Sequence, residues 1–147
     1  MNTSKLQIET VKAMTTQSSR VFSSELEGDV ILTFDGFSAY RLSPAQCCVD
    51  LSKAKKLDTM ADFFLLGKDD KQVSKSPLQY CTRDGILYGF KGENFTVWVK
   101  KALYEKFADD QEVWCSSPIS PVKLVSKVTG KVEAIVLPTR TNSAVEI

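Results

Sequence analysis

The chain has 147 residues, and 19 Lys and Arg against 18 Asp and Glu give it a formal net charge of +1. Its hydrophobic content of 43% indicates a globular domain, and its near-neutral charge excludes a strongly basic nucleic-acid binder. It contains no His, which excludes histidine general bases, Ser-His-Asp and Cys-His nucleophile systems, and imidazole metal ligands. We expect one domain over residues 1–140 and a flexible tail at residues 141–147.

The N-terminal third predicts a helix followed by strands. Ser4 can cap a helix over residues 4–17. The apolar stripe of this helix consists of Leu6, Ile8, Val11 and Met14. Alternating apolar and polar residues then indicate strands at residues 21–26, 30–34 and 37–42. Asp35-Gly36 predicts a hairpin between the last two, because glycine tolerates a positive φ. We expect a further strand at residues 47–51.

The C-terminal part of the chain repeats the order of a helix followed by strands, after a middle segment with a less regular pattern. A polar connector at residues 52–58 precedes an apolar segment at residues 60–66. Loops are expected at residues 67–71 and 75–77. Strands are expected at residues 78–82, 86–90 and 95–99. A second helix over residues 100–108 is followed by strands at residues 112–116, 122–126 and 132–137.

A helix followed by a three-stranded meander thus occurs twice. Each meander has one apolar face that needs a cover, and its helix can supply one. The sequence therefore predicts an α+β fold of mainly antiparallel sheets with two covering helices.

The cysteines and the apolar runs indicate the cellular location of the protein. Cys47, Cys48, Cys81 and Cys115 form no CxxC pair, which disfavours a four-thiolate zinc site. We expect them to be buried, reduced thiols, and we expect no cofactor or metal. The start of the chain has no signal-peptide pattern, and no apolar run is long enough to cross a bilayer. We therefore expect a cytoplasmic protein without membrane contact.

Catalytic patterns are sparse. The many Asp residues form no motif that would place two carboxylates on a metal or a sugar. Gly67-Lys68 lacks the other residues of a phosphate-binding P-loop. Trp98 and Trp114 could stack on single-stranded nucleic acid, but their strand positions favour core packing. We expect a protein that is not an enzyme.

The C-terminal motifs occur in an order that resembles a known family. A Phe-Thr-Val-Trp-Val strand and a helix precede a Val-Trp strand, a Ser-Pro-Val strand and a final Leu-Pro-Thr-Arg sequence. The residues that carry the resemblance lie at 95–99, 101–107, 112–115, 120–124 and 133–140, with a shorter echo at 32–37. This order is similar to the last half-domain of the bacterial DNA polymerase III β-subunit, the sliding clamp. The resemblance implies the fold of a single DNA-clamp domain, whereas the clamp subunit carries three.

In the clamp family, lysines of the helices contact DNA phosphates without reading bases. The positions of this chain that match are Lys5, Lys12, Lys100, Lys101 and Lys106. The resemblance therefore implies a DNA-binding face. A solvated helix face, balanced by Glu9 and Glu105, is the alternative.

The clamp family also binds short peptides in an apolar groove beside its C-terminal strand. The matching positions for binding a peptide or partner are Ile135, Leu137, Pro138 and Arg140. Arg140 would pair with an acidic group of the peptide. Alternation alone puts Ile135 and Leu137 on one face, which favours the alternative that they are core residues on the buried face of an edge strand.

Two functions follow from these observations. The first is a non-enzymatic clamp-like protein that associates with duplex DNA or a replication protein, and that could form a homo-oligomer. The second is an intracellular protein-binding or structural module, of the type found in phages or mobile elements, that does not bind DNA. The C-terminal motifs favour the first, and the neutral charge favours the second.

Overall fold

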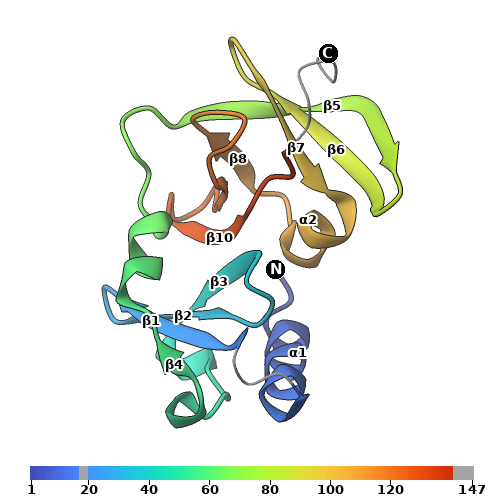
Figure 1. Cartoon of the computed structure of the whole chain (residues 1–147). Coiled ribbons are helices and arrows are strands. Elements are labelled where there is room, and N and C mark those ends of the chain that lie inside the picture. Colours follow the sequence, from blue (N-terminus) through green and yellow to red (C-terminus); the bar gives the residue numbers. More distant parts are fainter. Residues whose placement is uncertain (17–19, 141–147) are drawn as a thin grey trace.

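The computed structural model describes residues 1–16 and 20–140 (Figure 1). These residues form an α+β fold, which confirms the expected class. The strands follow the order β4-β1-β2-β3-β10-β9-β8-β5-β6-β7. Neighbouring strands are antiparallel, except that β4 runs parallel to β1.

The N-terminal unit is the expected helix and meander. Its elements are α1 (Thr3–Thr16), β1 (Phe22–Leu26), β2 (Asp29–Thr33) and β3 (Ser38–Leu42). The predicted helix end at Gln17 lies outside the described residues, as does the predicted tail. The hairpin between β2 and β3 forms at Asp35-Gly36, where Gly36 has a φ of 78°. Oδ1 of Asp35 accepts hydrogen bonds from the backbone N–H groups of Phe37 (2.8 Å) and Ser38 (2.9 Å), which fixes this turn.

The C-terminal unit has the same order. Its elements are β7 (Thr96–Lys100), α2 (Lys101–Phe107), β8 (Glu112–Cys115), β9 (Val122–Val125) and β10 (Val132–Val136). The two units meet where β10 pairs with β3, with Ile135 opposite Ala39. β10 therefore lies in the centre of the sheet, so the expectation of an edge strand there was wrong.

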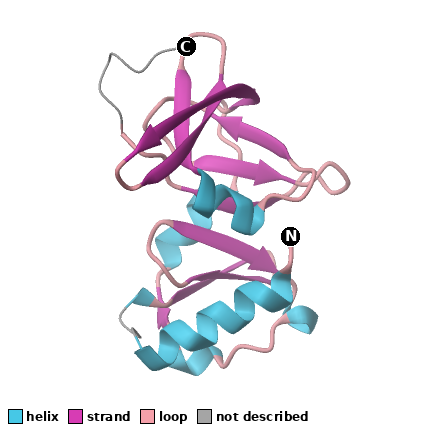
Figure 2. Ribbon diagram, turned by 90° about the vertical axis from the view of Figure 1, so that its right-hand side faces the viewer, coloured by secondary structure: helices cyan, strands magenta, loops and turns pink. Residues whose placement is uncertain are grey.

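The central strands separate two apolar clusters. Successive residues of a strand point to opposite faces, so Leu32 and Tyr40 lie in one cluster and their neighbours Ile31 and Ala39 in the other. The larger cluster includes Leu6 of α1 and Phe107 of α2, so both helices cover the same face of the sheet. Figure 2 is viewed from this side and shows α1 in front of the lower strands, with α2 above it.

The connector, which we define as residues 43–70, contributes to both faces of the sheet, because Val49 in its first half is buried in the larger cluster and its second half covers the opposite face. It contains the 3-10 helices η2 (Pro44–Gln46), η3 (Leu51–Lys53) and η4 (Asp58–Phe64) and the short strand β4 (Lys55–Lys56). Met60 and Phe64 of η4 are buried in the smaller cluster. Figure 1 shows η4 on the side of the sheet away from α1 and α2.

The strand expected at residues 47–51 was wrong. The backbone N–H of Cys48 donates to Oε1 of Gln7 (2.6 Å) rather than to a neighbouring strand. The Asp50 side chain accepts from the backbone N–H of Ser52 (3.1 Å) and thereby caps η3. These local bonds replace the strand, as Asp and Ser side chains commonly do in turns.

The loop expected at residues 75–77 was also wrong, because these residues belong to β5 (Lys71–Thr82), which pairs with β6 (Gly85–Lys91). The register shifts between Lys75 and Gln79, which places Pro77 in a bulge. A proline is tolerated there because a bulged residue need not donate to the neighbouring strand.

The buried face of α1 also differs from the expected stripe. Ile8 and Val11 are exposed, whereas Gln7 and Thr10 are buried with Leu6. Thr10 Oγ1 lies 2.7 Å from the Tyr40 hydroxyl and donates to the Leu6 carbonyl oxygen (2.8 Å). Gln7 and Thr10 thus share the buried side of α1 with Leu6, and both have hydrogen-bond partners there.

The cysteines are free thiols, but they are not uniformly buried. Cys115 is buried and Cys47 half-buried, whereas Cys48 and Cys81 are exposed, so the expectation of buried thiols was wrong for these two. Neither α1 nor α2 is long and apolar enough to cross a membrane, and the same holds for every helix among the described residues.

Candidate functional site

An apolar groove of about 230 Å³ lies between η4 and the junction of β3 with β10. Its floor is formed by strand residues that pair across the sheet, Phe22 with Thr33 and Ala39 with Ile135. Leu57, Met60 and Phe63 form one wall. These three residues are spaced three apart along a 3-10 helix and its N-cap, so they lie on one side of it.

The other wall is formed where the chain leaves β10. Leu137 lines the groove, and its backbone N–H donates to the Phe37 carbonyl oxygen (2.8 Å). This bond sets Leu137 beside Phe37 at the mouth of the groove. Leu137 is 39% exposed and Phe37 is 56% exposed.

The structure brings two of the four predicted partner-binding residues into this groove. Ile135 is 5% exposed and belongs to the smaller core cluster, and it also lines the groove. Pro138 and Arg140 are not among the described lining residues. Beyond Leu137 the chain turns towards β7, where the Thr139 backbone N–H donates to the Trp98 carbonyl oxygen (2.8 Å).

Sequence reasoning missed the remaining wall of the groove. Phe37, Leu57 and Phe63 are all exposed large apolar residues. The signal that could have found Leu57 and Phe63 is the i, i+3, i+6 spacing of Leu57, Met60 and Phe63, which puts these side chains in one row on a 3-10 helix but not on an α-helix or a strand.

The predicted DNA-binding lysines lie in two places. Lys5, Lys12 and Lys106 are exposed on α1 and α2, and Lys101 is half-exposed at the start of α2. Lys100 pairs with Leu87 at the end of β7. By strand alternation it points to the side of β7 away from Val99, which packs in the core with α2. Lys100 is therefore separated from the other four.

The two helices lie side by side and share a polar hollow of about 440 Å³. Lys5 and Glu9 of α1, and Glu105 and Lys106 of α2, line it. The face thus carries carboxylates among its lysines, so both the phosphate-binding and the solvated interpretation fit its composition.

Aromatic rings position the lysines of α2. Nζ of Lys106 lies 5.3 Å from the ring centroid of Phe34, and Nζ of Lys101 lies 5.9 Å from that of Tyr88. The Tyr88 hydroxyl donates to Oε1 of Glu105 (2.9 Å), and this bond raises the pKa of Tyr88. The hydroxyl also takes up one acceptor position of Glu105.

The two tryptophans pack against other side chains of the protein. Trp98 is 3% exposed and lies 6.0 Å from the ring of Tyr80, and Trp114 packs against the smaller core cluster. No group of three His, Cys, Asp or Glu residues within residues 1–16 and 20–140 is arranged to hold a metal ion.

Comparisons with protein-family models, curated proteins and solved structures find no match to this chain.

Proposed function

We propose that this chain is a non-enzymatic, clamp-like module that binds an extended segment of a partner protein in the groove beside η4. The observation that carries the proposal is the lining of the groove, in which every described residue is apolar or is Gly, Ser or Thr. Such a lining offers no acid, base or metal ligand, so it supports docking rather than catalysis.

The size of the groove favours side chains of a partner over a small molecule. Sites for small molecules usually enclose about 300–1,000 Å³. The groove, at about 230 Å³, has room for one or two apolar side chains. Phe37, Leu57, Phe63 and Leu137 would lose contact with water on binding, which is the favourable term in such a complex.

The test is a selection of random twelve-residue peptides displayed on phage against the intact chain. We expect the enriched peptides to contain paired apolar residues and to bind Leu137→Asp at least tenfold more weakly, because the carboxylate enters an apolar wall. Val128→Asp is the matched control, since Val128 is 94% exposed outside the groove. Equal binding of selected peptides to the wild type and Leu137→Asp, or no enrichment at all, would refute the proposal.

A second candidate function is contact with duplex DNA through α1 and α2. It is favoured by the placement of Lys5, Lys12, Lys101 and Lys106 on two helices that lie side by side (Figure 2). These lysines would contact phosphates independently of sequence, so the affinity would fall as salt rises.

The test of this second candidate is the salt dependence of binding to a fluorescein-labelled 30-base-pair duplex. We expect Lys5→Glu/Lys12→Glu to bind more weakly and to flatten the plot of log affinity against log salt. Lys131→Glu, in the turn before β10, is the control and should behave like the wild type. A duplex that binds the double variant and the wild type with the same salt slope would remove the helix face from consideration.

A further inference from the structure

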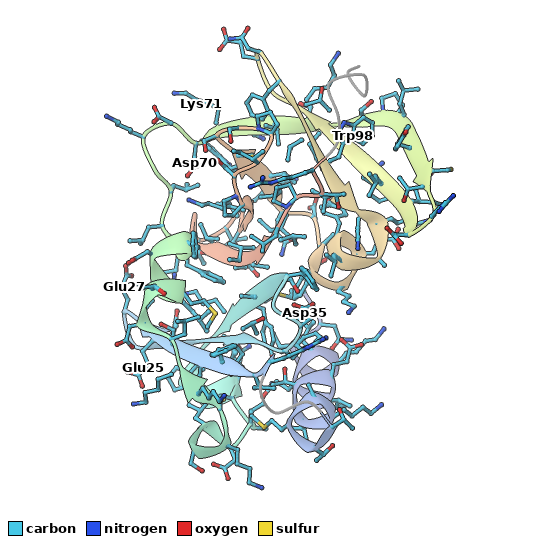
Figure 3. All side chains as sticks on the ribbon, viewed as in Figure 1. Glu25, Glu27, Asp35, Asp70, Lys71 and Trp98 are labelled. Carbon is cyan, nitrogen blue, oxygen red and sulfur yellow. The ribbon has the colours of Figure 1, made fainter. Side chains whose placement is uncertain are left out.

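A buried ion pair lies beneath the end of the connector. Nζ of Lys123 in β9 lies 2.7 Å from Oδ2 of Asp70, and the two side chains are 10% and 5% exposed. The same ammonium group donates to the carbonyl oxygen of Leu65 (2.6 Å), and the Gly67 backbone N–H donates to Oδ2 of Asp70 (2.6 Å). Figure 3 shows Asp70 where the connector enters β5. The pair therefore fixes the segment that directly follows η4.

Lys123 stands next to the groove floor in the sheet. It pairs with Ile135 on one side and with Trp114 on the other, so its side chain leaves the same face of the sheet as Ile135. The row that begins in the groove with Ala39 and Ile135 thus continues into Lys123. Ile135 in the groove floor and Lys123, which binds the connector, are therefore direct neighbours in the sheet.

The groove wall is held at both ends. At its start, the backbone N–H of Leu57 donates to the Ser23 carbonyl oxygen of β1 (2.9 Å). In its middle, Met60 and Phe64 are buried in the smaller cluster. At its end, Leu65 is bound by Lys123. Only this last attachment uses charged side chains.

We infer that Lys123 and Asp70 are positioning residues of the groove, because they fix the end of η4 and so set the distance between the Leu57–Met60–Phe63 wall and the sheet. The inference rests on the proposed function, since it concerns the site at which the partner segment would bind. Burial of an ion pair is weak evidence for stabilisation, because apolar or neutral replacements of both partners often leave stability unchanged. A role in placing the connector explains the pair better.

The test variant is Lys123→Leu/Asp70→Asn. It removes both charges together, so no buried charge is left without a partner, and the Asn oxygen can still accept from Gly67. The matched control is Lys127→Leu/Asp110→Asn, which removes an exposed ion pair of similar length (2.9 Å). The same two substitutions are thus compared at the connector and on the surface.

Methyl-labelled methionine gives a readout that needs no ligand, because the chain has only three methionines. Met60 lines the groove, whereas Met1 and Met14 pack against the larger cluster with α1. In the test variant we expect the Met60 methyl resonance to shift or broaden, with Met1 and Met14 unchanged. We also expect amide exchange in residues 58–66 to become at least tenfold faster while exchange in β2 and β3 stays the same.

The control variant should leave all three methyl signals and the amide exchange as in the wild type. An unchanged Met60 signal with unchanged exchange in residues 58–66 would overturn the inference. Equal acceleration of exchange throughout the chain would also overturn it, since the pair would then support the whole fold rather than the wall.

Binding of the selected peptide then separates this inference from the proposed function. We expect at least fivefold weaker binding to the test variant and no change in the control. A peptide that binds both variants alike, despite a displaced Met60 signal, would overturn the positioning role. If no peptide binds the wild type, the proposed function fails, whereas the methyl and exchange results still decide whether the pair holds the wall.

Discussion

Replacing Tyr40 by Phe should change how the stability of the chain depends on pH. Tyr40 is fully buried, and its hydroxyl lies 2.7 Å from Thr10 Oγ1. Because Thr10 gives its own proton to the Leu6 carbonyl oxygen, the Tyr40 hydroxyl is the donor in this bond. Burial raises the pKa of Tyr40 well above its usual value, so the folded state keeps the phenol protonated.

The size of the expected change in stability follows from the hydrogen bond of Tyr40 and from its raised pKa. At pH 7 Tyr40→Phe loses one buried hydrogen bond, which lowers the free energy of unfolding by about 1 kcal/mol. Above pH 10 the unfolded wild-type chain gains stability by ionising Tyr40, whereas the folded chain does not. With an unfolded pKa near 10, the wild type therefore loses about 0.4 kcal/mol at pH 10 and about 1.4 kcal/mol at pH 11 through this residue.

Tyr40→Phe has no phenol to ionise at this position. Its free energy of unfolding, which is below that of the wild type at pH 7, should therefore equal the wild-type value between pH 10 and pH 11 and exceed it at higher pH. Urea denaturation of both proteins, followed by circular dichroism at pH 8, 10 and 11, measures the difference. The other tyrosines and the lysines titrate in both chains and cancel from it. Tyr80→Phe is the control for the loss of a phenol hydroxyl outside the core, because Tyr80 is 42% exposed. A difference between wild type and Tyr40→Phe that stays constant from pH 8 to pH 11 would refute the reasoning.

Two further predictions concern the thiols and the assembly of the chain. In the native protein, Ellman's reagent should modify the exposed Cys48 and Cys81 within minutes, whereas Cys115 should react only after unfolding, because burial shields its thiol and raises its pKa. Fast labelling of Cys115 would show that β8 opens readily. If the chain assembles as a clamp, light scattering should give a mass above 16.3 kDa that increases further with duplex DNA at low salt. A mass of one chain that does not respond to DNA would leave only the protein-binding proposal.

Local patterns in the sequence were sufficient to predict the strands and turns of the two meanders. Asp35-Gly36 places a small, flexible residue where the chain needs a positive φ, so the hairpin could be read from two residues. The strands of the C-terminal unit alternate clearly and were placed within about two residues of their ends. Such features depend on neighbours in the sequence and are visible without the fold.

Features that depend on distant partners could not be predicted. Gln7 is buried because it binds the backbone of residues 46 and 48, and nothing near Gln7 in the sequence indicates this. The pair of Lys123 and Asp70 joins residues 53 positions apart. The sequence could indicate that Ile135 and Leu137 share a face, but the facing wall comes from a 3-10 helix whose position depends on the connector crossing the sheet.

The two candidate surfaces lie on opposite faces of the central strands. Neighbouring residues of β10 make this clear, since Ala134 packs in the cluster that α1 and α2 cover and Ile135 packs in the cluster under η4. A partner segment in the groove would therefore leave the helix lysines in contact with solvent. The two proposals are independent in space, so binding of the selected peptide should leave the affinity for duplex DNA unchanged, and DNA should leave the peptide affinity unchanged. Strong competition between peptide and duplex in a fluorescence anisotropy titration would mean that one of the two surfaces has been assigned to the wrong ligand.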